Sequence, residues 1–435
     1  MSIGQQSKPP LGIAEDGPAI EVPSEVRYKY KIPIPIDSER RTVVFYPTSG
    51  NGTYSAGQTV KFNFAGNYAD MANSYLAFDC HYTRAAGDSN TFMRSPHDCF
   101  RHVAVVETAT GRTIENLTDY NVLYEMMGRH TAKAHYNPYE HAGGPGVAAA
   151  ANSFAIPRNA TTTLAGRFAI QPYTGLLRSK LYLPLKWMSG GLEVQLTLDT
   201  DANVVLAANA DTVLVYSNFR WVIDMVSLDA NFDTALGQWL SMAPTNQLNV
   251  PFETFTSHNA DGNQPNPSIT ITQQVRSLKS FYAVRRANAN IGVITTDAFD
   301  FPRAGGGQAI NSFELRIGSQ QHPAFTVPAG PVMYNELMKS LGHLMDSQNQ
   351  NAVTDAATNP AALAEYEGHS YIIGVNLERH THDEFFMMTG ISTFTYSPIL
   401  FVLHCNAAAA TTITSFLHFD GIMGVNFTGQ CVIEY

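Results

Sequence analysis

Polar and apolar residues alternate at a period of two along most of the chain. The clearest case is 192–199, where Leu or Val occupies every second position and Glu, Gln, Thr and Asp fill the others. The same period recurs at 76–82 and at 219–225. Successive side chains of a strand point to opposite faces of its sheet, so this alternation predicts half-buried β-strands.

Two short segments carry a helical period instead, and both read Tyr-Asn-x-Leu. They are Tyr120–Met127 and Tyr334–Leu341, in which apolar residues recur at intervals of three and four. This spacing places the apolar side chains on one face of a helix. We therefore expect one short helix at each segment.

The order of elements around these two helices also repeats. In each half of the chain, strands come first, then the helix, then a long aperiodic loop (129–178 and 346–370), and then more strands. Matching elements lie about 200 residues apart, which is the scale of a duplicated domain and not of a solenoid repeat. Each half holds about eight short strands, a number typical of a jelly roll. The predicted fold is all-β, with two tandem antiparallel jelly-roll sandwiches that each carry one short helix.

Changes in pattern divide the chain into four segments. Residues 1–38 are rich in proline and show little periodicity, which predicts an extended N-terminal arm. Residues 39–228 form the first predicted jelly roll, and 250–435 form the second. Between them, 229–249 break the alternation and are interpreted as a connector.

Composition bears on the kind of partner. Only 15% of the 435 residues are charged, against about 25% in ordinary soluble domains. Large buried interfaces are depleted in charge, so this deficit indicates a surface that partners cover. The net charge of −10 argues against direct nucleic-acid binding, which needs clustered Lys and Arg.

Features of targeting and redox chemistry point to a protein that is not secreted. The first ten residues are polar and lack the apolar core of a signal peptide. Ser2 excludes N-myristoylation, and no apolar run approaches the ~18 residues of a membrane span. The four cysteines, Cys80, Cys99, Cys405 and Cys431, show no CxxC spacing. We interpret them as buried free thiols of a reducing compartment.

The sequence His-Thr-His at 380–382 is the strongest local signal for chemistry. On a strand, His380 and His382 would face the same side and could bind one metal, with Asp383 or Glu384 nearby. Cupin enzymes, which are jelly rolls, use an HxH of this kind. Their pattern places its Glu farther along and adds another His downstream, whereas Glu384 comes too soon. We therefore interpret the segment as a polar turn and assign no metal ligand.

Two other motifs are incomplete. The run 199–203 begins like a calcium loop but has Val204 at the sixth place and Ala210 at the twelfth, where Gly and Glu are needed. The Gly-rich run 144–149 imitates a dinucleotide fingerprint without the preceding strand. We interpret the first as a turn and the second as a loop. No catalytic or cofactor-binding residue is assigned, no cofactor is expected, and the chain is not predicted to be an enzyme.

A duplicated all-β chain with a short helix in each half resembles the double jelly-roll major capsid proteins of the adenovirus and tailless-phage lineage. Local stretches are similar to those of polinton-like virus and virophage capsid proteins, and the resemblance covers nearly all of 40–435. These stretches are Gly111–Glu115 followed by Tyr120 and Asn121, Leu183–Leu185 with Gly190 and Gly191, and the closing run to Tyr435.

The resemblance implies a major capsid protein of an icosahedral double-stranded DNA virus. Three copies would form a homotrimer whose six jelly rolls make a pseudo-hexagonal capsomer. The long loops would rise as outer towers, and the arm would lie on the inner face. The implied partners are other copies, neighbouring capsomers, and penton and minor capsid proteins, in a virion assembled inside the host cell. The resemblance leaves open whether a membrane lies beneath the shell, and the short towers imply a small, simple capsid.

Two other functions fit the same fold prediction. A bicupin-like metal-dependent enzyme would use His380 and His382. A lectin-like or fibre-type binding protein would present aromatic loop residues to sugars. Stoichiometric metal in the purified protein would favour the enzyme, and a monomer that binds glycans would favour the binding protein.

Overall fold

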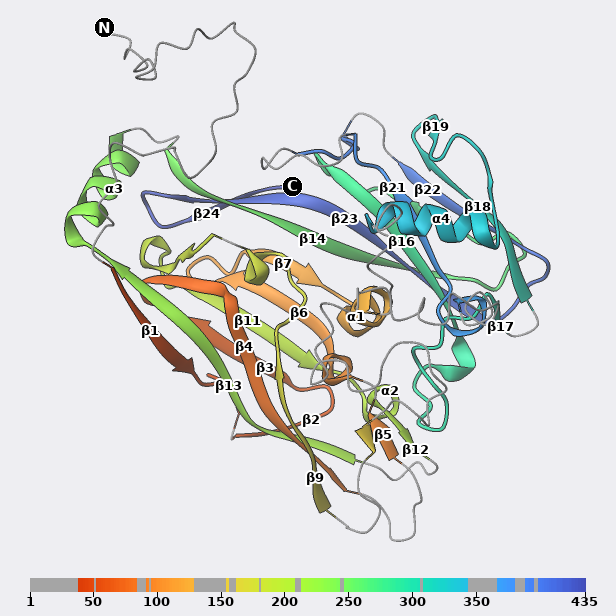
Figure 1. Cartoon of the computed structure of the whole chain (residues 1–435), viewed down its shortest axis with the longest axis horizontal. Coiled ribbons are helices and arrows are strands. Elements are labelled where there is room, and N and C mark those ends of the chain that lie inside the picture. The colour runs from red at the N-terminus through yellow and green to blue at the C-terminus, as the bar shows by residue number, and fades with distance from the viewer. Residues whose placement is uncertain are drawn as a thin grey trace, which may run out of the picture. The chain divides into compact units, whose positions relative to one another are not determined.

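The computed structural model describes most of the chain after residue 37, with internal gaps. The described residues are 38–50, 52–83, 91–93, 95–128, 154–155, 162–179, 181–207, 213–242, 246–305, 308–342, 366–379, 388–394 and 398–435. All of them belong to the second of two units, Ser38–Tyr435. Within them, antiparallel sheets dominate and helices are few (Figure 1).

The first sandwich consists of two facing sheets. One sheet has the order β1-β13-β4, with β9 and β10 also paired to β4 and β2 paired to β13. The other has the order β3-β11-β6-β7, and every pairing is antiparallel. The strands are β1 (Ser38–Phe45), β2 (Thr53–Ser55), β3 (Thr59–Phe64), β4 (Tyr68–Thr83), β6 (Phe100–Glu107), β7 (Thr113–Leu117), β9 (Thr162–Ile170), β10 (Leu183–Pro184), β11 (Leu192–Leu198) and β13 (Val213–Leu228).

The second sandwich repeats this arrangement. One sheet has the order β14-β23-β16-β21, with β24 on β23, and the other has the order β15-β22-β18 with β17, β19 and β20 paired to β18. Its strands are β14 (Gln247–Asp261), β15 (Ser268–Ile271), β16 (Leu278–Ala287), β17 (Ala304–Gly305), β18 (Gln308–Ile317), β19 (Gln320–Gln321), β20 (Val327–Pro328), β21 (Ile372–Asn376), β22 (Ile399–Cys405), β23 (Thr411–Asn426) and β24 (Cys431–Glu434).

The two sandwiches correspond strand for strand. The order β1-β13-β4-β9 in the first matches β14-β23-β16-β21 in the second, and β3-β11-β6-β7 matches β15-β22-β18-β20. Both orders interleave early and late strands, as a jelly roll does. The prediction of two tandem jelly rolls is therefore confirmed.

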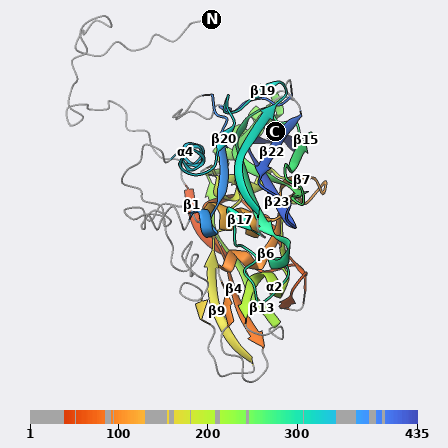
Figure 2. The same ribbon diagram turned by 90° about the vertical axis from the view of Figure 1, so that its right-hand side faces the viewer.

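The two Tyr-Asn segments are helices at equivalent places. Helix α1 (Tyr120–Gly128) follows β7, and α4 (Pro331–Ser340) follows β20. Helix α4 lies against β20 and β21 (Figure 2). The other helices are α2 (Asp201–Val204) and α3 (Ala230–Met242), with short 3-10 turns η2 (Pro96–Cys99), η4 (Leu176–Arg178), η5 (Leu185–Trp187) and η6 (Asn288–Asn290).

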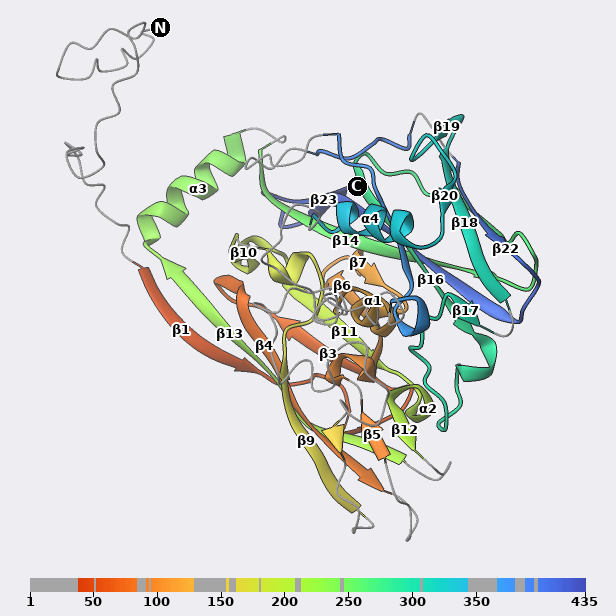
Figure 3. The same ribbon diagram turned by 45° about the vertical axis from the view of Figure 1, so that its right-hand side comes forward.

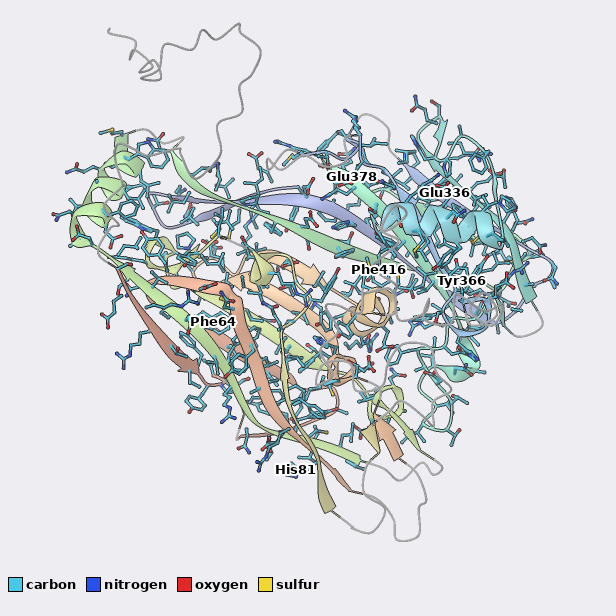
Figure 4. All side chains as sticks on the ribbon, viewed as in Figure 1. Phe64, His81, Glu336, Tyr366, Glu378 and Phe416 are labelled. Atoms are coloured by element: carbon cyan, nitrogen blue, oxygen red, sulfur yellow. The ribbon has the colours of Figure 1, made fainter. Side chains whose placement is uncertain are left out.

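Aromatic side chains fill both interiors. In the first sandwich Trp221, Phe62 and Phe64 are fully buried, and the indole meets each phenyl ring edge to face, with centroids 5.4 Å from Phe62 and 5.2 Å from Phe64. In the second, Phe281 and Phe313 both contact the ring of Phe401. Figure 4 shows Phe64 in the first sandwich and Phe416 in the second. Each buried ring contributes about 1.5–3 kcal/mol, so the alternating residues of the strands stabilise the two cores.

A third small sheet is built from three separate connections of the first sandwich. It has the order β12-β5-β8, namely β12 (Val205–Ala207), β5 (Thr91–Met93) and β8 (Phe154–Ala155). Along the chain, β12 lies between β11 and β13, β5 lies between β4 and β6, and β8 lies between α1 and β9. We call this element the loop sheet. It brings three loops together at one end of the first sandwich (Figure 1).

Several elements were not predicted. Strand β9 lies within 129–178, the segment expected to be an aperiodic loop, and it pairs with β4. Helix α3 occupies the predicted connector, and the long strands β14 and β23 lack a clean alternation. In β23 the neighbours Phe416 and Leu417 point to opposite faces of the sheet, yet Phe416 is only 1% exposed and Leu417 is 0% exposed. Because both faces of this strand are covered there, no polar face marks it in the sequence.

Candidate interaction surfaces

The sequence motifs for metal or cofactor binding do not form a site in the described part of the chain. His380 and His382 lie outside the described residues, as does the Gly-rich run 144–149. Among the residues that are described, no group of three His, Cys, Asp or Glu side chains is placed to hold a metal ion. In the same residues, no helix is long and apolar enough to cross a membrane.

The calcium-like run is a turn that leads into α2. The Asp199 carboxylate accepts hydrogen bonds from Nδ2 of Asn121, at 2.6 Å, and from Nδ2 of Asn203, at 3.0 Å. The backbone N–H of Thr200 donates to its other oxygen at 2.7 Å. The carboxylate therefore connects α1 to α2 through protein donors.

The four cysteines are free, and three of them are buried. Burial raises the pKa of the Cys431 thiol to about 12 and shifts the pKa of Cys80 and Cys99 in the same direction. The reactive form of cysteine is the thiolate, so these thiols are inert at neutral pH. The prediction of free thiols is confirmed for all four, although Cys405 is only half-buried.

The clearest polar cluster joins the two sandwiches. Glu115 on β7 is fully buried and accepts hydrogen bonds from the backbone N–H groups of Gly175 (2.8 Å) and Leu176 (3.2 Å). It also accepts one from the hydroxyl of Thr254 on β14, at 2.9 Å. Burial raises the pKa of Glu115 to about 7, against the opposing effect of these donors. One carboxyl group of the first sandwich thus binds the second.

Gly175 allows the close approach at this junction. A Cβ at this position would lie 1.4 Å from the carbonyl oxygen of Glu253. The backbone before η4 therefore lies directly on β14, and any side chain at 175 would push the two sandwiches apart.

Further contacts extend this junction along β24 and β14. Glu107 accepts the backbone N–H of Cys431 at 2.8 Å, and Arg112 donates to the carbonyl of the same residue at 3.2 Å. Asp119, held at φ 53°, accepts from Ser257 (3.0 Å) and Asn259 (2.9 Å) of β14. A backbone conformation this rare persists only where its surroundings hold it. The contacts indicate that the sandwiches form a fixed pair.

A network of charges lies on the same sheet of the second sandwich. The Lys279 ammonium is 2.5 Å from Glu253, 3.2 Å from Glu378 and 3.8 Å from Asp420. The ring of His418 lies 3.1 Å from Glu253 and holds the pKa of that carboxyl well below its usual range, with Lys279 acting in the same direction. Although burial opposes it, the acidic neighbours raise the pKa of Lys279. A lysine that stays protonated is not a nucleophile, so the network is a structural one.

The first sandwich carries a depression of about 570 Å³. Asp79, Arg167 and Arg220 contribute to its lining, together with Asn218 at φ 54°. Nδ2 of Asn218 donates to Asp79 at 2.7 Å, and Nε of Arg167 lies 3.8 Å from that carboxylate. Among the described lining residues, no nucleophile lies beside a general base.

Comparisons with known proteins identify the fold. No protein-family model and no curated protein sequence matches the chain. Among solved structures, the PBCV-1 virus capsid is similar with a TM-score of 0.60 at 10% identity, over 94% of this chain and 99% of that one. The Faustovirus major capsid protein matches with a TM-score of 0.57 at 7% identity, over 91% and 92%.

The mavirus major capsid protein matches with a TM-score of 0.53 at 10% identity, over 98% of this chain and 96% of that one. These similarities extend over almost the full length of both partners, including both sandwiches. The chain therefore has the double jelly-roll fold of these capsid proteins.

Proposed function

We propose that this chain, which has the double jelly-roll fold, is a major capsid protein of an icosahedral double-stranded DNA virus. The observation that supports this most strongly is the match to capsid chains over 91–98% of this chain and 92–99% of theirs. A fold alone does not dictate a function, so the proposal also depends on the surface and on the junction between the sandwiches.

The junction supports a trimeric capsomer. A threefold axis acting on two similar sandwiches gives a nearly sixfold outline, but only if the pair keeps one geometry. The contacts of Glu115, Glu107 and Asp119 across the junction supply that rigidity. We therefore propose a homotrimer whose six jelly rolls form a pseudo-hexagonal capsomer.

The low charge content supports extensive contacts between copies. With 15% charged residues, the chain resembles proteins whose surface is largely covered in an assembly. Permanent interfaces commonly bury more than roughly 2,000 Å², and we expect each subunit contact in the trimer to exceed that area.

The strand directions suggest which end faces outward. Strand β13 has 16 residues and spans about 50 Å at roughly 3.3 Å per residue. It begins at Val213, shortly after β12 of the loop sheet, and ends at Leu228, which pairs with Ser38. We propose that the loop-sheet end faces outward and that the end from which the arm departs faces the shell interior.

We further propose the division into an arm (1–38), a first jelly roll (39–228), a connector (229–249) and a second jelly roll (250–435). The partners would be other copies, neighbouring capsomers, and penton and minor capsid proteins, without direct nucleic-acid binding. The protein would reside in the virion, be assembled inside the host cell and have neither enzymatic activity nor a cofactor.

Negative-stain electron microscopy and light scattering on the purified full-length chain test the proposal. The expected result is a particle of three times the mass of one chain with a pseudo-hexagonal outline. A stable monomer at micromolar concentration would contradict it. A monomer that bound stoichiometric metal would support the bicupin alternative, and one that bound glycans would support the lectin alternative.

A further inference from the structure

Helix α3 presents its apolar side to the outside. Asp233 and Leu240 are buried and, with Gly237, follow the i, i+4, i+7 spacing of one helix face. On the other side Trp239 is 44% exposed and Met242 is 77% exposed. A helix on the surface of a globular protein ordinarily buries its apolar stripe, so the orientation of α3 is reversed.

The inward face of α3 is held by specific contacts. The Asp233 carboxylate accepts a hydrogen bond from the hydroxyl of Tyr68 at 2.9 Å, and its other oxygen lies 2.5 Å from the Lys186 ammonium. The Trp187 indole donates to the same Tyr68 oxygen at 2.8 Å, and its ring edge lies 3.0 Å from where a Cβ on Gly237 would be. These contacts prevent α3 from rotating to bury its apolar side.

The outward side forms a continuous stripe. We call it the α3 stripe, and its members recur at i, i+3, i+4, i+7 and i+10. They are Phe232, Ala235, Trp239 and Met242, which are exposed, and Leu236, which is half-buried. Trp, Phe and Met are enriched in protein–protein interfaces, and clustered aromatic residues often dominate their affinity. Figure 3 shows α3 joining the end of β13 to β14, beside the start of β1.

We propose that the α3 stripe is a subunit contact that packs against a second copy of this chain in the oligomer. This inference rests on the proposed function, which it deepens by naming a surface and its occupant. In an assembly of identical chains, each copy has one α3 stripe, so there is one neighbouring copy available to cover each stripe.

Charge argues against a lipid surface as the occupant. Helices that lie on membranes carry Lys and Arg on their polar face. Asp233 is the one charged residue between 230 and 242, and it is buried and already paired. The net charge of −10 would further oppose an anionic headgroup layer. The uncharged stripe instead suits an apolar protein surface.

Tryptophan fluorescence offers a direct test, because Trp239 is the exposed member of three tryptophans. Trp221 is fully buried and Trp187 is half-buried. Acrylamide quenching would be measured on full-length protein diluted through its dissociation range, with Trp239→Phe to identify the signal of Trp239. The expected result is a several-fold fall in the quenching constant of Trp239 on association. Unchanged accessibility in the oligomer, or protection already in the monomer, would overturn the proposal.

Matched variants give the second test. Trp239→Ser and Met242→Ser should each raise the dissociation constant measured by sedimentation roughly tenfold or more. Phe325→Ser is the control, because this ring is 48% exposed between β19 and β20. Near-ultraviolet circular dichroism would confirm that each variant is folded. An equal effect of the control and the stripe variants would contradict a special role for α3.

The possible outcomes separate this inference from the proposed function. A wild-type chain that stays monomeric would refute the capsomer. A wild-type oligomer that the stripe variants leave intact would refute the α3 contact alone. Flotation of wild-type protein with phosphatidylcholine or phosphatidylglycerol vesicles, lost in Trp239→Ser, would show a lipid occupant and overturn the proposal.

Discussion

At the scale of single residues, Glu115 is the most consequential polar group. It is fully buried, and its three hydrogen-bond donors come from two different sandwiches. Desolvation disfavours its ionised form more than these donors favour it, which is why its pKa rises to about 7. Its protonation is therefore coupled to the stability of the junction.

We expect the free energy of unfolding to fall as the pH rises from about 5 to about 8. The pKa of Glu115 in the folded chain, about 7, exceeds the ordinary 4.5. The contribution of Glu115 to the free energy of unfolding is therefore fully present below pH 4.5. That contribution is lost as the pH rises through 7, and the change is at most about 3 kcal/mol. Urea unfolding at pH 5 to 8.5 should show this fall in wild type and in the exposed control Glu39→Gln.

In Glu115→Gln the same pH dependence should be missing, because the amide does not titrate. The informative quantity is the difference between this variant and wild type, since other groups titrate equally in both. A variant whose stability follows wild type at every pH would show that Glu115 is not the group responsible.

Gly175→Ala should destabilise the chain by about 3 kcal/mol or more, because the added methyl group would overlap the carbonyl of Glu253 on β14. The backbone at 175 is in the right-handed helical region, so the effect would come from space and not from backbone strain. Gly368→Ala is the matched control, since a Cβ there meets nothing within 4 Å. Thermal unfolding of both variants would check this, and equal midpoints would contradict a tight junction.

The variant His380→Ala/His382→Ala is expected to fold and to assemble like wild type. If the two residues belong to a polar turn, their loss should change stability by no more than about 0.5 kcal/mol. Light scattering and elemental analysis would measure assembly and bound metal together. Loss of a stoichiometric metal along with an activity would instead support the bicupin alternative.

At the scale of elements, polar contacts help to fix the positions of helices α1 and α3. The hydroxyl of Tyr120 in α1 is hydrogen-bonded to Nδ1 of His97 at 2.7 Å. The same hydroxyl oxygen accepts a hydrogen bond from the backbone N–H of Tyr173 at 2.9 Å. Helix α3 depends on Asp233 in a comparable way. A change at one of these residues should therefore affect a whole element.

Asp233→Ala should loosen α3 at a cost of about 1–3 kcal/mol, because Tyr68 and Lys186 would lose their acceptor. Chymotrypsin, which cleaves after aromatic residues, should then cut within α3 faster than in wild type. Asn231→Ala, at an exposed position of the same helix, should leave the cleavage rate unchanged. Equal cleavage in all three proteins would mean that Asp233 does not hold the helix.

At the scale of the whole molecule, two similar sandwiches form one unit through contacts that connect β6 and β7 to β14 and β24. The residues before Ser38 form a separate unit. The proposed capsomer therefore needs the paired sandwiches, and we propose that the arm contacts neighbouring capsomers.

Deletion of residues 1–37 is expected to leave the trimer intact and to weaken the shell. The strand pairing of β1 starts at Ser38, so the deletion removes none of the strands in the described part of the chain. Light scattering should give the wild-type trimer mass, and electron microscopy should show fewer or less stable shells. A monomeric deletion variant would place the arm in the trimer contacts instead.

The sequence by itself determined the all-β class, the duplication and the two equivalent helices. These features depend on local periodicity. Apolar residues recur every two residues in a strand with one solvent-exposed face and about every 3.6 residues in a helix with one solvent-exposed face. Strand β11 and helices α1 and α4 were found in this way, and the jelly-roll prediction then rested on the number of short strands in each half.

Only the tertiary structure decided the elements and contacts that break those periods. Strand β23 is covered on both faces around Phe416 and Leu417, so it alternates poorly. Glu115 binds Gly175, which is 60 residues farther along the chain, and Thr254, which is 139 residues farther along. No local pattern extends over such distances. Helix α3 has an apolar stripe whose direction no periodicity reveals, because spacing defines a face but not what the face meets. That direction depends on Asp233, whose partners are brought to it by the fold.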